Sequence, residues 1–247
     1  MITFTGVRSD AEQLKKAKEH PGYRPDDKSN PLHRQLIGYI GLFLPVILIF
    51  MAVFRDGVEQ WRSLRSVSAY YYSGAVVAFV GMLVALSLFL FTYRGFRNKH
   101  YRAERVVSII AAVAALVVAI FPTGAPEGVD PLSWWTPLSG ILHLVFAILL
   151  FLLFAVFALF LFPIKAREMK VRPGKRRRNR VYYSCGIVIL ASIAWAGING
   201  RLGKSIFWPE SIALAAFAIS WLVKGRAIAG FVNRIRSRRQ WKAALKK

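Results

Sequence analysis

The chain has 247 residues, of which 55% are hydrophobic, and its formal net charge at pH 7 is +23. A soluble domain of this length does not need so many long apolar runs to build its core. A strongly basic chain raises nucleic acid as a partner, but no RNA- or DNA-binding module is visible, and membrane topology accounts for the charge. We therefore exclude a soluble domain and expect no nucleic-acid partner.

Six apolar runs follow one another along the chain, at residues 36–54, 74–93, 106–121, 138–162, 181–198 and 205–223. A helix needs about 20 residues to cross a hydrocarbon core about 30 Å thick. Apart from Glu210, near the start of the last run, none of the runs contains a charged residue. The third run is short, so we expect its helix to include residues 101–105. The sequence predicts an all-α fold, a polytopic bundle of six transmembrane helices.

The Lys and Arg residues lie between these runs on alternate sides. Thirty of the 35 fall in segments 1–35, 94–105 and 164–180 and after residue 223, whereas the other connections hold five. Positive charge accumulates in cytoplasmic loops. We therefore predict cytoplasmic N and C termini and a multi-pass protein of the inner (plasma) membrane, with a cytoplasmic arm at residues 1–35 and a basic amphipathic cytoplasmic tail at residues 224–247.

The fourth connection contains a dense basic cluster. Such clusters attract anionic phospholipid of the inner leaflet, although the simpler interpretation, which we favour, is that the cluster only fixes the orientation of the chain. The residues predicted to contact anionic lipid are Lys175, Arg176, Arg177, Arg178 and Arg180.

Aromatic residues and a few charges gather in the connections predicted to lie outside. Tyrosine and tryptophan are typical of the membrane–water interface, and arginine can bind a lipid phosphate with two parallel hydrogen bonds. His143 is the one histidine inside an apolar run, where an ionisable residue suggests a function, although a packed structural histidine is the alternative. The residues predicted to line an outer ligand-binding cavity are Arg65, Tyr70, Tyr71, Tyr72, Trp134, Trp135 and His143.

Enzymatic chemistry has weaker support. A metal site needs about three His or carboxylate ligands, and the other three histidines map across the membrane from His143. A Ser-His-Asp arrangement of Ser68 or Ser139 with His143 and Asp130 lacks a nucleophile-elbow motif. The single cysteine, Cys185, excludes a disulfide within the chain. We therefore assign no catalytic residue, no metal and no cofactor.

Several short motifs carry a resemblance over about residues 35–225: the segment 66–72 (SVSAYYY), Tyr93-Arg94-Gly95, Phe121-Pro122-Thr123, Leu142-His143, and Glu210 with Trp221-Leu222-Val223-Lys224-Gly225. They resemble a group of uncharacterised bacterial six-helix membrane proteins, which is distantly similar to the DRAM/Sfk-like membrane proteins. The resemblance implies a six-helix bundle in a bacterial inner membrane. It carries no catalytic residues over, and the link of the eukaryotic relatives to lipid organisation favours lipid as a ligand.

The leading hypothesis is a non-enzymatic protein that binds or organises membrane lipid through an outer-leaflet cavity. Its partners are membrane lipids, and a membrane-protein partner or a second copy of the chain remains open. The alternatives are an intramembrane enzyme acting on a lipid, which depends on His143 with Glu127 or Asp130, and a small transporter. A transporter needs polar residues facing one another at mid-bilayer, and the runs supply only scattered serines.

Overall fold

The computed structural model describes residues 31–58, 64–95, 101–164 and 175–226. The predicted arm before residue 31 and the tail after residue 226 lie outside the described residues. The described part is all α, with no strand, which confirms the all-α part of the predicted fold class. Its elements are α2 (Pro31–Asp56), the 3₁₀ turn η1 (Ser68–Tyr72), α4 (Val76–Thr92), α5 (Tyr101–Ile120), α6 (Pro137–Val156), the π-helical turn η2 (Phe157–Leu161), α7 (Lys175–Arg201) and α8 (Phe207–Lys224).

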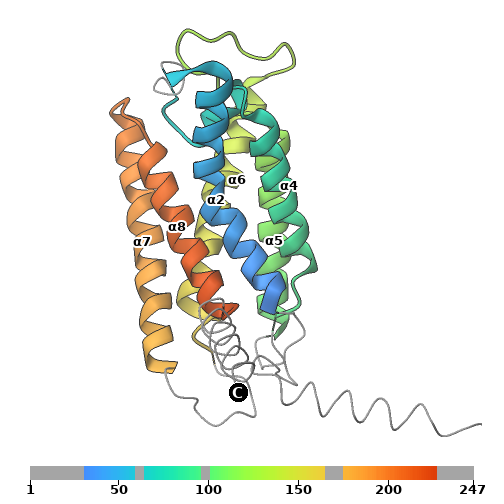
Figure 1. Cartoon of the computed structure of the whole chain (residues 1–247), viewed down its shortest axis with the longest axis vertical. Coiled ribbons are helices and arrows are strands. Elements are labelled where there is room, and N and C mark those ends of the chain that lie inside the picture. The colour runs from blue at the N-terminus through green and yellow to red at the C-terminus, as the bar shows by residue number, and fades with distance from the viewer. Residues whose placement is uncertain (1–30, 59–63, 96–100, 165–174, 227–247) are drawn as a thin grey trace, which may run out of the picture.

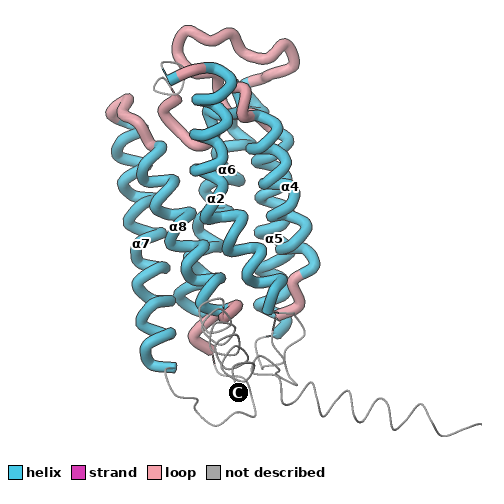
Figure 2. Tube along the Cα trace, in the orientation of Figure 1, coloured by secondary structure: helices cyan, strands magenta, loops and turns pink. Residues whose placement is uncertain are grey.

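The six helices form a closed ring in chain order. Each helix packs against the next one along the chain, and α8 packs back against α2. Consecutive helices run in opposite directions (Figure 1), so the connecting segments gather at two ends (Figure 2). We call the end formed by residues 64–75, 121–136 and 202–206 the cap end. The opposite end, where α2, α5 and α7 begin, is the basic end.

Within the described residues, four helical segments are long and apolar enough to cross a membrane: α2, α5, α6 continued by η2, and α7. Helix α4 is apolar but has 17 residues, and α8 has 18, with Glu210 in its first turn and Lys224 in its last. These lengths and compositions are those of a multi-pass membrane protein.

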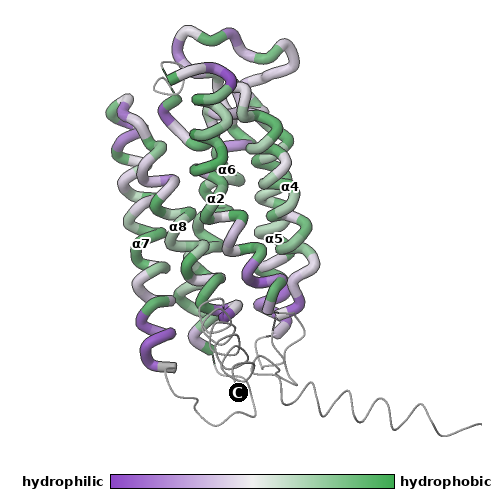
Figure 3. The backbone as a smooth tube through the Cα atoms, in the orientation of Figure 1, coloured by the Kyte–Doolittle hydropathy of each residue, from purple (hydrophilic) through white to green (hydrophobic). Residues whose placement is uncertain are grey.

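The outer surface of the ring is also apolar. Phe54, Val77 and Phe50 are 79%, 76% and 66% exposed, and Figure 3 shows hydrophobic residues along the length of the helices with hydrophilic ones toward the ends. A soluble bundle keeps its surface polar because exposed apolar area costs about 25 cal/mol per Å² in water. Lipid chains remove that cost, since they are as apolar as the side chains they contact.

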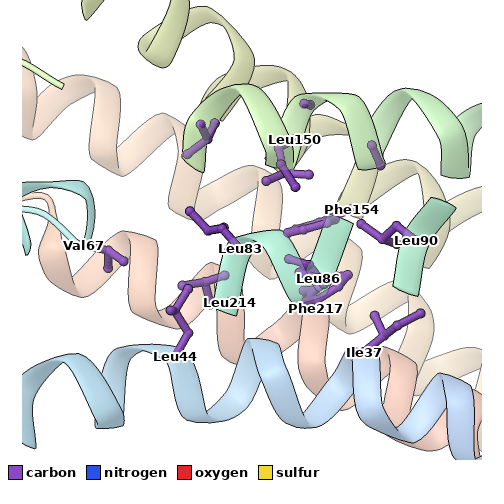
Figure 4. Packing of buried hydrophobic residues seen from close by; sticks show 14 of the residues in the cluster. Ile37, Leu44, Val67, Leu83, Leu86, Leu90, Leu150, Phe154, Leu214 and Phe217 are labelled. Atoms are coloured by element: carbon purple, nitrogen blue, oxygen red, sulfur yellow. The ribbon is translucent and has the colours of Figure 1, made fainter. Parts of the chain in front are cut away.

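Inside the ring, large apolar side chains from several helices interlock (Figure 4). The rings of Phe154 from α6 and Phe217 from α8 stack with centroids 3.6 Å apart. Toward the basic end the fully buried Trp221 meets Tyr93 edge-on at 4.9 Å. The centre of the bundle is thus filled by packed rings and aliphatic side chains.

Two helices extend well beyond their apolar runs. Helix α2 begins at Pro31, five residues before the predicted run, and α7 begins at Lys175, six residues before its run. Arginine and lysine are good helix formers, so a helix that leaves the hydrocarbon continues through them. Helix α5 begins at Tyr101, as expected from the shortness of the third run.

Helices α2 and α8 approach closely at two glycines. A Cβ atom on Gly41 would lie 2.7 Å from Cδ1 of Phe217, and one on Gly38 would lie 2.8 Å from Cγ of Leu222. Neither distance is compatible with an added methyl group unless the neighbour moves. The glycines of the first run therefore permit the contact that closes the ring.

We predict that Gly41→Ala lowers the melting temperature of the detergent-solubilised protein, because overpacking a filled interface costs about 1–3 kcal/mol. Gly81→Ala in α4 is the matched control, since a Cβ there has nothing within 4 Å and alanine is the better helix former. Equal melting temperatures for the two variants would contradict the proposed role of Gly41.

Candidate functional site at the cap end

Residues 64–75, which we call the tyrosine loop, close the bundle between α2 and α4 and contain η1. Two serines stabilise its turns. Ser66 Oγ accepts a hydrogen bond from the backbone N–H of Ala69 at 2.9 Å, and Ser73 Oγ donates to the carbonyl of Tyr70 at 2.8 Å. Short hydroxyl side chains satisfy backbone groups of tight turns in this way, so the serine spacing favours a turn here.

The tyrosine loop is bound to the start of α8 through backbone groups. The carbonyl of Arg65 accepts hydrogen bonds from the N–H groups of Ile206 and Phe207 at 2.8 and 2.9 Å. In return, Glu210 Oε2 accepts from the N–H of Val67 at 2.6 Å. The first N–H groups of a helix lack partners within the helix, and the loop supplies them. Glu210 therefore positions the loop in addition to complementing the helix dipole.

The three adjacent tyrosines have different environments. Tyr70 is fully buried. Tyr71 Oη donates to the carbonyl of Ile120 at 3.3 Å, and Tyr72 Oη donates to the carbonyl of Thr123 at 2.8 Å. Burial raises the pKa of both Tyr71 and Tyr72 above the ordinary value of 10.0, so both hydroxyls remain protonated donors at neutral pH.

His143, in α6, joins the tyrosine loop to the end of α5. It is 3% exposed. Its Nδ1 lies 2.6 Å from the carbonyl oxygen of Phe121, and its Nε2 lies 2.8 Å from Oγ of Ser68. A carbonyl oxygen can only accept, so Nδ1 carries the proton of a neutral ring. Nε2 is then the acceptor, and the Ser68 hydroxyl is its donor.

This geometry decides between the serines considered from the sequence. Ser139 Oγ donates to the carbonyl of Thr136 at 2.6 Å and belongs to the capping box that begins α6. Ser68 is the serine that contacts His143. The place beside Nδ1, which Asp130 would take in a Ser-His-Asp arrangement, is held by the Phe121 carbonyl.

The two tryptophans before α6 lie at the surface of the bundle. Trp134 is 54% exposed. The ring of Trp135 lies on the first turns of α6, where a Cβ on Gly140 would be 3.2 Å from its Cζ2 atom. An exposed ring next to a packed one is typical of an interfacial aromatic belt.

A pocket of about 400 Å³ opens between the tyrosine loop and the segment after α5. Of the seven residues predicted to line an outer cavity, Arg65 lines this pocket; the three tyrosines, the two tryptophans and His143 do not. Most of the other residues that line the pocket were not predicted, because small residues carry no charge or aromatic ring that would single them out in a sequence. The lining residues are Arg65, Ser66, Ala69, Thr123, Gly124, Pro126 and Glu127.

The pocket contains one cation and one carboxylate. Arg65 Nη1 donates to the carbonyl of Gly203 at 3.1 Å, which ties the guanidinium to the loop before α8. A guanidinium has five N–H donors, so this bond leaves further donors for a ligand. Glu127, which the sequence suggested only in connection with an enzyme, is exposed in the loop opposite.

A comparison with protein families gives a match to the family described as "Protein of unknown function (DUF998)", over residues 42–237. The chain belongs to this family. The expectation of an uncharacterised family is thus confirmed, whereas the similarity to DRAM/Sfk-like proteins remains a prediction. No curated protein matches the chain, and no solved structure matches it.

At the basic end of this DUF998 chain, the predicted lipid-contacting cluster forms the start of α7. Arg176, Arg177 and Arg180 are exposed, and Arg178 is half-buried. The cluster therefore lies along one helix rather than in a loop. Its contact with anionic lipid remains a prediction.

A buried polar group that was not among the residues predicted from the sequence lies at the basic end of this DUF998 chain. Glu104 is 1% exposed and accepts a hydrogen bond from Tyr93 Oη at 2.7 Å, while Arg105 Nη1 donates to the carbonyl of Tyr93 at 2.7 Å. Residues 101–105 were expected to belong to the third helix, but no partner was predicted for Glu104. A Cβ atom on Gly95 would lie 2.8 Å from Cδ of Glu104, so this glycine leaves room for the buried carboxyl group.

The described residues contain no candidate metal site. Among residues 31–58, 64–95, 101–164 and 175–226, no three His, Cys, Asp or Glu side chains gather in a way that could hold a metal ion.

We predict that Glu210→Ala destabilises the protein by about 1–3 kcal/mol, the usual cost of leaving a buried donor, here the Val67 N–H, without its partner. Glu210→Gln keeps a carbonyl acceptor for the Val67 N–H and should lose less. Chemical denaturation in detergent measures both variants. Equal losses for Ala and Gln would show that the acceptor oxygen does not hold the loop.

Proposed function

We propose that this chain is a six-span protein of a bacterial inner membrane with both termini in the cytoplasm. The distribution of Lys and Arg supports this orientation, since 30 of the 35 fall on one predicted side. Helices α4 and α8 complete the six spans, because each lies in the closed ring between longer apolar helices. The cap end then faces away from the cytoplasm.

The orientation is testable by cysteine accessibility. In a Cys185→Ala background, Glu127→Cys should react in intact cells with a membrane-impermeant maleimide, whereas Arg176→Cys should react only after the membrane is opened. Charged side chains cross a bilayer poorly, so the two positions should report opposite compartments. Labelling of Arg176→Cys in intact cells would overturn the orientation and the site's location.

The function we propose is binding of a phospholipid headgroup in the cap-end pocket. The observation that carries this proposal is the presence of both Arg65 and Glu127 in the lining of one open pocket of about 400 Å³. Arginine binds phosphate through charge-assisted hydrogen bonds, and a carboxylate accepts hydrogen bonds from an ammonium group. A zwitterionic headgroup such as phosphoethanolamine presents both charges. The neighbouring tyrosines and tryptophans favour the level of lipid headgroups.

Conduction of an ion or a polar solute has less support. Two of the buried serines have their hydroxyls bound to helix carbonyls: Ser87 Oγ donates to the carbonyl of Ala112 at 2.7 Å, and Ser220 Oγ donates to the carbonyl of Phe217 at 2.7 Å. Hydroxyls that are already bound to backbone carbonyls are poorly placed to coordinate a passing solute. The stacked rings of the core fill the bundle axis between the two ends.

We predict that Arg65→Ala reduces the phospholipid that copurifies with the protein by about tenfold or more, since a charge-assisted hydrogen bond is worth about 1.5–3 kcal/mol. Native mass spectrometry of protein extracted in mild detergent measures the bound lipid. Lys204→Ala is the matched control, because Lys204 lies at the same end and is exposed but does not line the pocket.

A second variant tests the two charges of the headgroup separately. Glu127→Gln should reduce bound phosphatidylethanolamine and spare phosphatidylglycerol, which carries no ammonium group. Unchanged lipid content in Arg65→Ala, or an equal loss in Lys204→Ala, would reject the pocket as the binding site.

A further inference from the structure

The pair formed by Ser68 and His143 has the geometry of an activated nucleophile. The serine oxygen lies 2.8 Å from Nε2 of His143, within the reach required of a nucleophile and its general base. On the other side of the ring, the Phe121 carbonyl accepts from Nδ1 at 2.6 Å. That bond fixes the tautomer in which Nε2 can take a proton, which is the role of the third group in a catalytic triad.

The position of the pair suits a substrate that arrives from the membrane interface. Ser68 is partly exposed in the tyrosine loop, whereas His143 beneath it is buried. Ser68 is not itself among the residues that line the cap-end pocket, but Ser66 and Ala69, two residues before it and one after it, line that pocket, and so does Thr123, two residues after Phe121. The pair therefore lies beneath a segment whose neighbouring residues form the wall of an open pocket.

We infer that Ser68 and His143 are a catalytic pair that cleaves a carboxylic ester of a membrane lipid. This goes beyond headgroup binding and stands on the contacts of the pair itself. Four groups contribute: the Ser68 hydroxyl as nucleophile, His143 as base, the Phe121 carbonyl as the orienting acceptor, and water as the second substrate.

The reaction balances in two steps. Ser68 Oγ attacks the ester carbonyl while its proton passes to Nε2 of His143; the alcohol leaves with that proton, and the acyl group remains on Ser68. Water then attacks the acyl-enzyme, giving one proton to Nε2 and forming the carboxylic acid. The Ser68 oxygen recovers the proton from Nε2, which restores the resting pair. No oxidant, reductant or metal is required.

The experiment uses the full-length protein in detergent and a fluorophosphonate probe, which reacts with serines that are activated by a base. We expect the probe on Ser68, located by mass spectrometry of the labelled peptide, and no label in Ser68→Ala. Ser73→Ala, which alters a serine of the same loop that contacts Tyr70 instead of His143, should label as the wild type does. His143→Gln should slow labelling by about 100-fold or more, the usual effect of removing a general base.

Several outcomes would overturn the inference. An unlabelled wild-type protein, a label that persists in Ser68→Ala, or an unchanged rate in a folded His143→Gln variant would each reject the catalytic pair. If His143→Gln does not fold, the comparison of wild type with Ser68→Ala decides alone. Protein reconstituted in vesicles of phosphatidylethanolamine and phosphatidylglycerol should release fatty acid, and no release from a labelled wild type would reject the lipid ester. Lipid copurification with Arg65→Ala reports headgroup binding separately, so the two proposals can fail independently.

Discussion

Pairing of polar groups inside an apolar bundle is the constraint on which this structure depends. Where water is absent, an unpaired N–H or C=O costs several kcal/mol. Helices satisfy their own backbone along their length, so the demand concentrates at their ends. At the cap end, the tyrosine loop provides partners for these unpaired groups. It is hydrogen-bonded to the start of α8 through Arg65 and Glu210. It also binds the end of α5 and the segment after it through two tyrosine hydroxyls, and α6 through His143.

The elements of the fold were largely predictable, because each apolar run is long enough to require a helix. Their ends were not. Hydropathy detects hydrocarbon contact, whereas a helix ends where its hydrogen bonding ends, and α7 continues through the basic cluster from Lys175. Glu104 shows a second limit: hydropathy gave no sign that it is buried, because its partner Tyr93 belongs to the end of the preceding apolar run.

The candidate site was only partly predictable. The tyrosine segment, Arg65 and His143 stood out because their residue types are unusual in or beside apolar runs. The sequence offered both Ser68 and Ser139 as partners of His143 and could not choose between them, since Ser68 and His143 are separated by 75 positions and meet only in the folded bundle. The Phe121 carbonyl is a backbone group and has no sequence signal at all.

The closed ring has a consequence for how the protein is made. Helix α8 is the last of the described helices to leave the ribosome, yet it packs against α2, the first of them. The carbonyl of Arg65 and the N–H of Val67 therefore wait for α8 before they gain partners. A nascent chain that stops before α8 lacks both the helix that closes the ring and these two partners of the tyrosine loop. The hydrogen bonds of the cap end are therefore completed only after α8 has been synthesised.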